Sequence, residues 1–372
     1  MSSDSKSPET SLVVLLLAGP FEVRGTSSYT LRLGEHLKEH GVTATIVTPD
    51  ASAVEPARQS QLEIQEYRHL MVPVLGRGIL ELLYRDLVEE PPDVIHVQSR
   101  TMLKRGALLA RRLRRPFVVT VHDCPLPRER FVFDPLYGRK VLAVSEYVQK
   151  SVIDTGYVDP QLVEVIHSGV NVSPESEGML VLDPGHTPVV GTAGPLESVK
   201  GLPYFLGAAQ QVLKSGRQVE FLVSGAGPEE TNLRRLTREL GINDSVTFVP
   251  NLKDFSAALA AIDIFCLPSL QQGLGTIMLE AMACGKPVIG TQVGGISAAV
   301  RDNETGLIVP PSDSAILANR IIELLDDPLR ARSIGESAKM VVRDEFAVEY
   351  MVNRTANIYR EIVELDSMRE SR

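Results

Sequence analysis

The sequence predicts an α/β protein with two doubly wound parallel sheets, and three observations support this fold class. The chain has 372 residues, which is enough for two α/β domains of ordinary size. Short apolar runs rich in β-branched residues alternate with segments of helical periodicity along the chain. These runs are apolar on both faces, which is typical of parallel strands that lie beneath crossover helices.

The expected strands form two series, one in each half of the chain. The first series is 13–17, 43–48, 94–97, 117–121, 141–144 and 163–166, and the second is 189–192, 220–223, 246–249, 262–267, 287–290 and 306–309. The stretch between the two series is the least apolar and is rich in Gly, Pro, Ser and Glu. We therefore expect an N-terminal Rossmann-like domain at 1–168, a linker at 169–187, a C-terminal Rossmann-like domain at 188–344, and a helix at 345–372 that packs across a domain surface.

Several helices between these strands can be recognised by their periodicity and their ends. After Ser27, apolar residues recur every four positions, and Gly41 supplies the stop. A second helical pattern over 313–325 stops at Pro328. The tail over 345–365 is amphipathic, so its apolar side is expected to pack against another part of the protein.

Composition and charge exclude several classes of protein. The net charge of −9 gives no indication of a nucleic-acid partner, and the absence of Trp argues against a carbohydrate-binding module of stacked rings. The first eleven residues are polar, and the apolar run at 13–18 is too short to cross a bilayer. Three cysteines without Cys-x-x-Cys spacing indicate neither a disulfide framework nor a zinc site, so we expect a cytoplasmic protein: Cys124, Cys266 and Cys284.

The segment from Pro268 to Pro287 is the most informative for chemistry. An expected strand ends at Pro268, a loop with two glycines follows, and a helix runs from about Gly275. The N–H groups and macrodipole at such a helix start form a site for a diphosphate. Gly273 and Gly275 let the chain approach a ligand closely because they have no Cβ atom.

A single carboxylate, Glu280, lies one to two turns into this helix among Ile, Met, Leu and Ala residues. A carboxylate buried there needs hydrogen-bond donors, since leaving it unpaired is costly. The two vicinal hydroxyls of a ribose would supply them, and so would a neighbouring basic residue. The surrounding motif favours the ribose.

In this region the chain resembles glycosyltransferase family 4, whose members have the GT-B fold of two facing Rossmann-like domains. The family signature is Glu-Gly-Phe-Gly, then Glu-Ala-Met-Ala-x-Gly, then Pro-Val. Further segments also resemble family motifs: 93–96, 120–123, 263–269, 293–296 and 305–310. The signature positions are filled here by Gly273, Gly275, Glu280, Ala281, Met282, Ala283, Gly285, Pro287 and Val288.

The resemblance implies roles for several residues. Glu280 would hold the ribose of the donor nucleotide, and Lys200 would contact its diphosphate. Gln272 stands at the first glutamate position, near the donor sugar; it can donate and accept hydrogen bonds but carries no negative charge. Pro195 stands where the family usually has an Arg that also contacts the diphosphate.

Two glycine loops also match the family. Gly225 and Gly227 follow a strand and would lie near the nucleotide, although such turns are often merely tight. Gly25, in the first loop between a strand and a helix, could bring backbone N–H groups to the diphosphate. A plain turn glycine is the alternative for Gly25.

Two histidines lie at or near the ends of expected strands. His122 directly follows 117–121, so it should lie in the cleft; the resemblance implies that it orients the donor sugar, partly through its backbone carbonyl. A structural role is the alternative for His122. His96 is expected to belong to the core. No metal-ligand cluster appears in the sequence, so no metal is required.

A basic segment from Lys104 to Arg115 carries no acid and has a helical pattern. It is either a solvated helix face or a surface for an anionic acceptor or a membrane, since some relatives glycosylate membrane-bound lipids. The second alternative would place the protein at the inner face of the membrane.

Together these observations predict a retaining hexosyltransferase that moves a sugar from a nucleoside diphosphate sugar to a hydroxyl of a saccharide, lipid or small molecule. Gln272 and Pro195 favour a competing hypothesis, a sugar-nucleotide-binding or scaffold protein with weakened or lost catalysis. A sugar phosphorylase or a nucleotide-sugar epimerase of the same fold is a third alternative.

Overall fold

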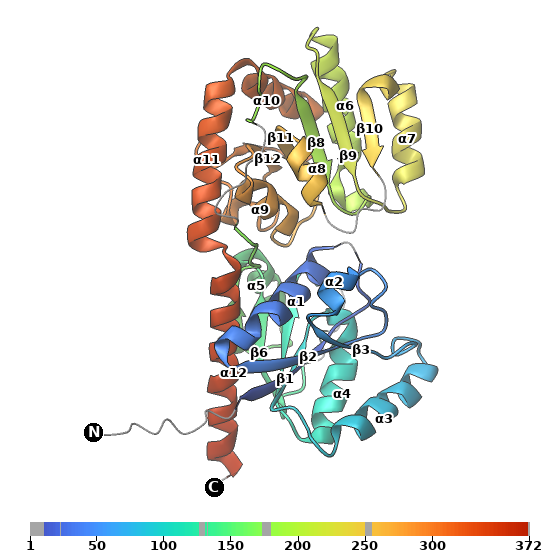
Figure 1. Ribbon diagram of the computed structural model, residues 1–372, viewed down its shortest axis with the longest axis vertical. Helices are drawn as coiled ribbons and strands as arrows, with labels where there is room; N and C mark the ends of the chain where they lie inside the picture. Colours follow the sequence, from blue (N-terminus) through green and yellow to red (C-terminus); the bar gives the residue numbers. More distant parts are fainter. Residues whose placement is uncertain are drawn as a thin grey trace, which may run out of the picture.

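The computed structural model describes residues 11–22, 24–125, 131, 133–172, 180–249 and 255–370. Two parallel sheets form the centres of two domains that are stacked along the long axis of the molecule (Figure 1). The sheet of the first domain has seven strands: β1 (Leu12–Leu17), β2 (Val42–Thr48), β3 (Glu63–Glu66), β4 (Val94–Val97), β5 (Phe117–Val121), β6 (Gly138–Ala143) and β7 (Val163–Val165). The sheet of the second domain has six: β8 (Val189–Ala193), β9 (Glu220–Ser224), β10 (Val246–Val249), β11 (Ile264–Leu267), β12 (Val288–Thr291) and β13 (Leu307–Val309).

Helices connect the strands and cover both faces of each sheet. In the amino-terminal domain they are α1 (Gly25–His36), α2 (Pro56–Gln59), α3 (Leu75–Leu87), α4 (Leu103–Leu113) and α5 (Glu146–Ile153). The carboxyl-terminal domain contains α6 (Leu202–Lys214), α7 (Glu230–Glu239), α8 (Ser256–Ala261), α9 (Thr276–Ala283), α10 (Ser314–Asp326) and α11 (Pro328–Glu345), and α12 (Val348–Glu370) ends the chain. This architecture is the predicted pair of doubly wound domains.

The two sheets repeat one topology. Their strand orders are β3-β2-β1-β4-β5-β6-β7 and β10-β9-β8-β11-β12-β13, and every strand pair is parallel. In each sheet the order reverses between the first strand of the series and a later one, β1 with β4 and β8 with β11. Ligands bind at such points, beyond the carboxyl ends of the strands.

Strand β3 is the main difference from the sequence-based expectation. Its four residues, Glu63–Glu66, form the edge of the sheet; three of them are polar, Ile64 is the single apolar one, and none is buried. The sequence pattern used for the other strands requires apolar runs, so it cannot detect an edge strand of this kind.

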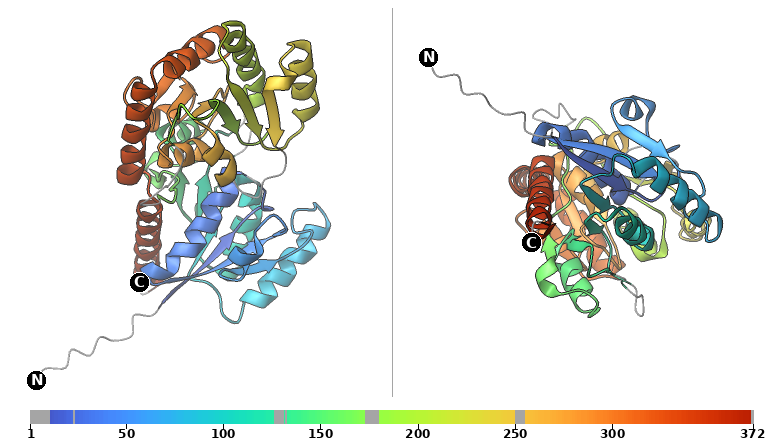
Figure 2. Two further views of the ribbon diagram at one scale, coloured as in Figure 1. Left: turned by 45° about the horizontal axis from the view of Figure 1, so that its top comes forward. Right: turned by 90° about the horizontal axis from the view of Figure 1, so that it is seen from below.

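The terminal helix returns to the first domain. Figures 1 and 2 show α11 along the carboxyl-terminal domain and α12 along the amino-terminal one. Met351, Tyr359 and Ile362 of α12 are buried in one cluster with Val14 and Leu33 of the first domain. The tail therefore completes the core of the domain that begins the chain.

The crossing between the domains is made by two adjacent segments. Val170 donates a backbone hydrogen bond to the carbonyl of Phe346 at 2.9 Å and accepts one from Val348 at 3.0 Å. A Cβ atom on Gly169 would lie 2.5 Å from the Cα atom of Val348, so the close approach requires glycine there. The predicted linker continues beyond this point; 173–179 lie outside the described residues, and 180–187 pack on the carboxyl-terminal domain, where Leu182 is buried.

Candidate active site

A cavity of about 330 Å³ lies between the domains, where the reversal points of the two sheets face each other. It is formed by the loops that follow β1, β4, β5, β8 and β11 and by the first turn of α9. Most of the predicted site residues line it: Gly25, His122, Lys200, Gln272, Gly273 and Gly275. The structure thus brings together residues from both ends of the sequence.

The loop between β11 and α9 forms the floor of this cavity. The backbone of Gly275 is left-handed (φ 99°), and α9 begins at the next residue, so Thr276 and Ile277 of its first turn line the cavity. A Cβ atom on Gly273 would collide with the carbonyl oxygen of His122 from the other domain. The loop is therefore held by close backbone contacts that only glycine permits.

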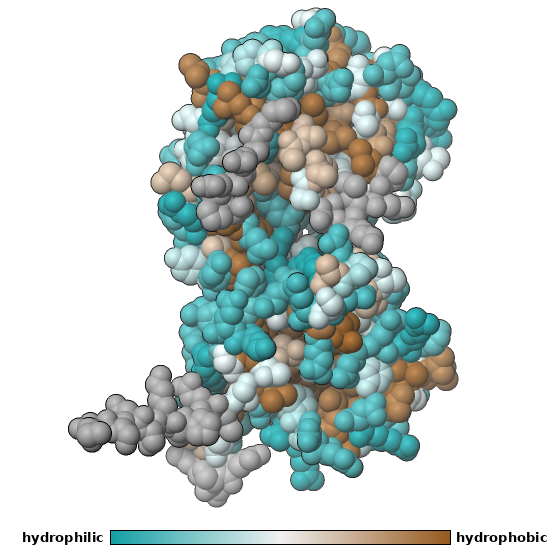
Figure 3. Space-filling view, in the orientation of Figure 1, coloured by the Kyte–Doolittle hydropathy of each residue, from teal (hydrophilic) through white to brown (hydrophobic). Residues whose placement is uncertain are grey.

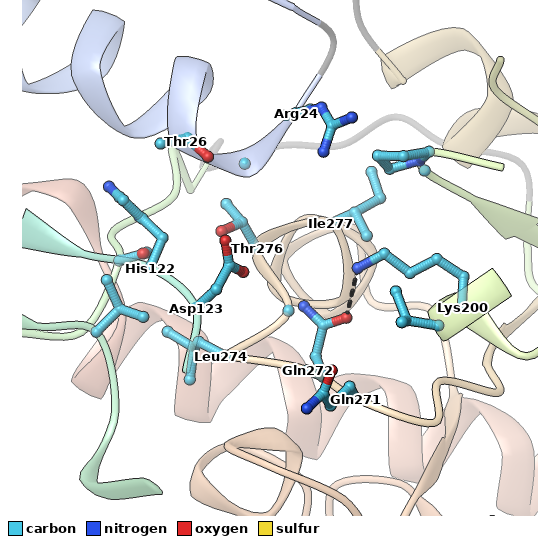
Figure 4. Close-up of a pocket in the computed structure, with 18 of the residues that line it drawn as sticks. Arg24, Thr26, His122, Asp123, Lys200, Gln271, Gln272, Leu274, Thr276 and Ile277 are labelled. Atoms are coloured by element: carbon cyan, nitrogen blue, oxygen red, sulfur yellow. Dashed lines mark hydrogen bonds between the residues drawn. The ribbon is translucent and has the colours of Figure 1, made fainter. Parts of the chain in front are cut away.

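Gln272 and Lys200 form a pair on this floor. The ammonium of Lys200 donates to Oε1 of Gln272 at 2.9 Å, and the hydroxyl of Ser269 donates to the same oxygen at 3.2 Å. Because an ammonium can only donate, this contact fixes which end of the amide is the oxygen. The amide nitrogen of Gln272 lies on the side of Asp123 (Figure 4), where it can donate to a ligand.

Lys200 is a cation in a confined, charged environment. Burial lowers its pKa below the ordinary value, the carboxylates of Asp123 and Glu197 oppose this shift, and Arg24 adds to it. An anion that enters the cavity would stabilise the charged ammonium. The position therefore suits a cation that binds phosphate.

His122 presents its backbone, more than its ring, to the floor of the cavity. Its ring meets the ring of Tyr29 of α1 edge-on, with 4.9 Å between centroids. Figure 4 shows the position of His122 on the wall of the cavity. Among the described residues its Nε2 atom has no hydrogen-bond partner. Burial lowers the pKa of His122 to about 4, although Asp123 opposes the shift, so the ring is neutral near pH 7.

Glu280 does not line this cavity. Its carboxylate forms an ion pair with Arg32 of α1, and Arg32 also donates to the carbonyl of Gly169 at 3.2 Å. Of the two partners that the sequence analysis considered for Glu280, the structure contains the basic one. Both residues line a second cavity, of about 660 Å³, which shares Phe255 with the first.

The predicted glycines divide into two groups. A Cβ atom on Gly25 would lie 2.9 Å from the hydroxyl of Thr276, so this glycine allows the loop after β1 to approach the start of α9. Gly225 and Gly227 instead lie against the backbone of the loop after β8, where a Cβ atom would collide with the carbonyls of Gly194 and Leu196. They support that loop from behind and are not part of the cavity wall.

The structure adds residues that the sequence analysis did not select. Arg24, Arg100, Asp123 and Thr276 all line the first cavity. Their sequence positions offered a signal. Asp123 directly follows His122, and Thr276 directly follows Gly275. Arg24 directly precedes Gly25, and Arg100 lies three residues beyond the strand expected at 94–97. Their type alone gave none, because charged residues are common in surface loops.

Half of the basic residues of the segment from Lys104 to Arg115 are bound within the domain. Arg105 donates to the carbonyls of Leu70 and Met71, Arg111 pairs with Asp134, and Arg112 pairs with Glu81. Lys104 and Arg114 are exposed.

No helix among the described residues is long and apolar enough to cross a bilayer. The same residues contain no group of three His, Cys, Asp or Glu side chains that could hold a metal ion.

Two family models match the chain. The model described as Glycosyltransferase Family 4 matches residues 23–174, and the model described as Glycosyl transferases group 1 matches residues 187–327. Each match coincides with one of the two sheets, and together they span most of the chain.

Some curated relatives match about half of the chain, and others match most of it. An alpha-D-kanosaminyltransferase of Streptomyces kanamyceticus is 29% identical over 47% of this chain and 46% of its own length. A GDP-mannose-dependent monoacylated alpha-(1-6)-phosphatidylinositol monomannoside mannosyltransferase of Corynebacterium glutamicum is 36% identical over 46% of this chain and 47% of its own length. The alignment thus spans about half the length of these two relatives. A D-inositol 3-phosphate glycosyltransferase of Nocardia farcinica is 26% identical over 85% of this chain and 80% of its own length.

Solved structures share the whole architecture. Anabaena Alr3699/HepE in complex with UDP and glucose superposes with a TM-score of 0.80 at 21% identity, covering 94% of this chain and 100% of that one. Sucrose-phosphate synthase from Thermosynechococcus elongatus gives 0.78 at 22% identity, covering 95% and 100%. At these identities the likeness concerns the fold.

The two facing Rossmann-like domains with a cavity between them define a protein of the GT-B fold class. Within this class, the chain is a glycosyltransferase that resembles family 4.

Proposed function

We propose that the protein transfers a sugar from a nucleoside diphosphate sugar to a hydroxyl acceptor, with retention of configuration at the anomeric carbon. The observation that carries this proposal is the cavity between the domains, where Lys200, Gln272 and the first turn of α9 meet. Names of similar proteins support the donor class: one relative is described as GDP-mannose-dependent, and one related structure contains UDP-glucose.

The charges of the cavity suit the two ends of such a donor. Lys200 and the N–H groups at the start of α9 bind the diphosphate. The amide nitrogen of Gln272 donates to a hydroxyl of the sugar, because its oxygen already accepts from Lys200. The nucleoside extends past Phe255 towards Glu280, which exchanges Arg32 for the ribose hydroxyls.

The reaction takes place on one face of the sugar. The acceptor oxygen forms a bond to the anomeric carbon while the bond from that carbon to the phosphate oxygen breaks. The proton of the acceptor passes to the departing phosphate oxygen, and the nucleoside diphosphate leaves with its negative charge held by Lys200. The neutral His122 takes no proton; its backbone carbonyl, at the cavity floor, accepts a hydrogen bond from the sugar. No metal ion is needed, because the cations of the chain supply the positive charge.

The donor can be identified by a thermal-shift screen of nucleotide sugars, since a ligand that binds the native state raises its apparent stability. Donor hydrolysis or transfer is then measured with the best ligand, and NMR of the product gives the anomeric configuration. Transfer with retention is expected.

Inversion would refute the mechanism. Phosphate-dependent cleavage would identify a phosphorylase, and formation of an epimer without an acceptor would identify an epimerase. Binding without turnover, restored by Gln272→Glu with Pro195→Arg, would identify a protein that has lost catalysis.

We also propose that the acceptor is presented at a membrane surface beside α3 and α4. Val74, Leu75 and Leu82 are exposed at α3, and Leu108 is exposed on α4, one turn beyond Lys104. Figure 3 shows apolar surface over the edge of the domain where α3 lies. Apolar side chains beside cations are typical of surfaces that bind anionic lipid. Co-sedimentation with phosphatidylglycerol vesicles, weakened by Lys104→Glu and absent with phosphatidylcholine, is the expected result; equal recovery with both lipids would contradict it.

A further inference from the structure

The loop after β8 contributes a single cation to the first cavity. Lys200 lies there, Pro195 contributes no charge, and Glu197 contributes a negative one. A diphosphate in this cavity would carry at least two negative charges. One ammonium and the partial charge of a helix start do not balance them.

Arg24 brings a second cation to the same place from the other domain. Its Nη2 atom donates to Oε1 of Glu197 at 2.6 Å, and its Nε atom donates to Glu22 at 2.5 Å. Figure 4 shows Arg24 reaching from the loop after β1 to the side of the cavity where Lys200 lies. The guanidinium is thus held at the domain interface by a carboxylate three residues before Lys200.

The contact with Glu197 is suited to exchange. The side chain of Arg24 is 45% exposed and that of Glu197 is 28% exposed. An ion pair with this exposure contributes little to stability, because water screens both charges. A guanidinium binds phosphate through two parallel hydrogen bonds, so it gains a stronger partner when a diphosphate arrives.

We propose that Arg24 is the second cation on the diphosphate of the donor, supplied by the amino-terminal domain, and that it exchanges Glu197 for a phosphate oxygen when the donor binds. This inference rests on the proposed function. As the bond between the anomeric carbon and the phosphate oxygen breaks, negative charge grows on the leaving diphosphate, and Arg24 stabilises that charge together with Lys200. Closure of the two domains and departure of the leaving group are then coupled through one side chain.

The test uses inorganic pyrophosphate as the first probe and the best nucleotide sugar of the screen as the second, in low-salt buffer with the full chain. Arg24→Gln is expected to weaken pyrophosphate binding about tenfold, as measured by calorimetry, and to lower kcat for transfer by at least as much. Pro195→Arg in the Arg24→Gln background is expected to recover part of both, since it places a cation in the loop after β8, which also carries Glu197 and Lys200. Glu197→Gln is expected to strengthen pyrophosphate binding, because it removes the competing carboxylate.

Arg68 provides the matched control. Like Arg24 it pairs through its Nε atom with a glutamate two residues earlier, Glu66, but it lies outside both cavities. Arg68→Gln is expected to leave binding and turnover unchanged. Unchanged pyrophosphate binding by Arg24→Gln would overturn the inference, and so would a loss with Glu197→Gln equal to that with Arg24→Gln, which would make Arg24 a residue of domain closure only. Failure of the wild-type chain to bind any nucleotide sugar would instead refute the proposed function.

Discussion

The two sheets have the same topology, but the loops at their reversal points differ in kind. On the carboxyl-terminal side, close backbone packing dominates: a Cβ atom on Gly201 or Gly294 would collide with a carbonyl oxygen of the loop between β11 and α9. On the amino-terminal side, Gly19 has only ordinary neighbours at 3.7 Å or beyond, and charged side chains such as Arg24 and Arg100 enter the cavity.

The carboxyl-terminal domain thus sets the shape of the cavity, and the amino-terminal domain adds charged side chains to it. In the carboxyl-terminal domain, the backbone at Gly201, Gly273 and Gly294 cannot accept an extra methyl group, because these loops are already in contact. The amino-terminal domain brings long side chains that can change partners. Substitutions on the two sides should therefore fail in different ways.

The largest effect is expected for Lys200, the one cation that the floor itself supplies. Lys200→Ala removes a charge that stabilises the leaving diphosphate, so kcat should fall by about 10²–10³-fold. Steady-state transfer kinetics measure this loss. Lys214→Ala, at an exposed position on α6, is the matched control and should behave as wild type. A wild-type kcat in the Lys200→Ala variant would show that Lys200 does not bind the leaving diphosphate.

A methyl group at Gly273 should be nearly as damaging. Gly273→Ala places Cβ against the carbonyl of His122, so the domains can no longer close, and transfer should fall about 100-fold while each domain keeps its fold. Activity and the thermal midpoint are measured together. Gly78→Ala, at an open position within α3, should leave activity unchanged and raise the midpoint slightly. A fully active Gly273→Ala variant would show that the closed arrangement is not needed for catalysis.

The ion pair between Arg32 and Glu280 joins the amino-terminal domain to the carboxyl-terminal one. Glu280→Ala should weaken donor binding about tenfold and lower the free energy of unfolding by about 2 kcal/mol, since Arg32 is left without its charged partner. Adding Arg32→Met should restore stability but not donor affinity, which separates the two effects. Calorimetry and denaturant unfolding measure them. Unchanged donor affinity in both variants would show that Glu280 stabilises the fold through its ion pair and does not bind the donor.

The amino-terminal domain should respond to acid through His96. This histidine is fully buried, and its ring contacts the hydroxyls of Tyr359 at 2.5 Å and Thr120 at 2.7 Å. Burial, with a smaller contribution from His122, lowers its pKa from 6.5 to about 3. The unfolded chain therefore binds the proton first, and His96 should contribute a fall of about 1.4 kcal/mol per pH unit to the free energy of unfolding as the pH drops below 6.5.

The contribution of His96 is isolated by comparing wild type with His96→Gln in urea unfolding at pH 7, 6 and 5. The variant should lose less stability over this range, because Gln does not titrate. Equal pH dependence in the two proteins would show that other groups control acid sensitivity.

The smallest effect is expected from metal removal. If Lys200 and Arg24 supply the positive charge that the diphosphate needs, EDTA should leave the transfer rate unchanged. The rate is measured before and after dialysis against the chelator. A loss that added magnesium restores would show that the cations of the chain are not sufficient.

Much of the candidate site was open to prediction. The loop between β11 and α9 is one continuous segment, so the spacing of Gly273, Gly275 and Glu280 carries its own signal. His122 directly follows an expected strand, Lys200 lies in the loop after another and was assigned by the resemblance, and both line the cavity. The position of Glu280 in the nucleotide site remains a prediction.

The sequence alone determined the alternation of strands and helices, the two series, and the glycine positions in the loops, because these depend on the chain's local periodicity and backbone freedom. Tertiary structure decided which side chains meet. Arg32 and Glu280 are separated by 248 residues and Arg24 and Glu197 by 173, and no local pattern records such pairs. Strand β3 and the docking of α12 were decided in the same way, since an edge strand needs a neighbour and an amphipathic helix packs on whichever surface its connection allows it to reach.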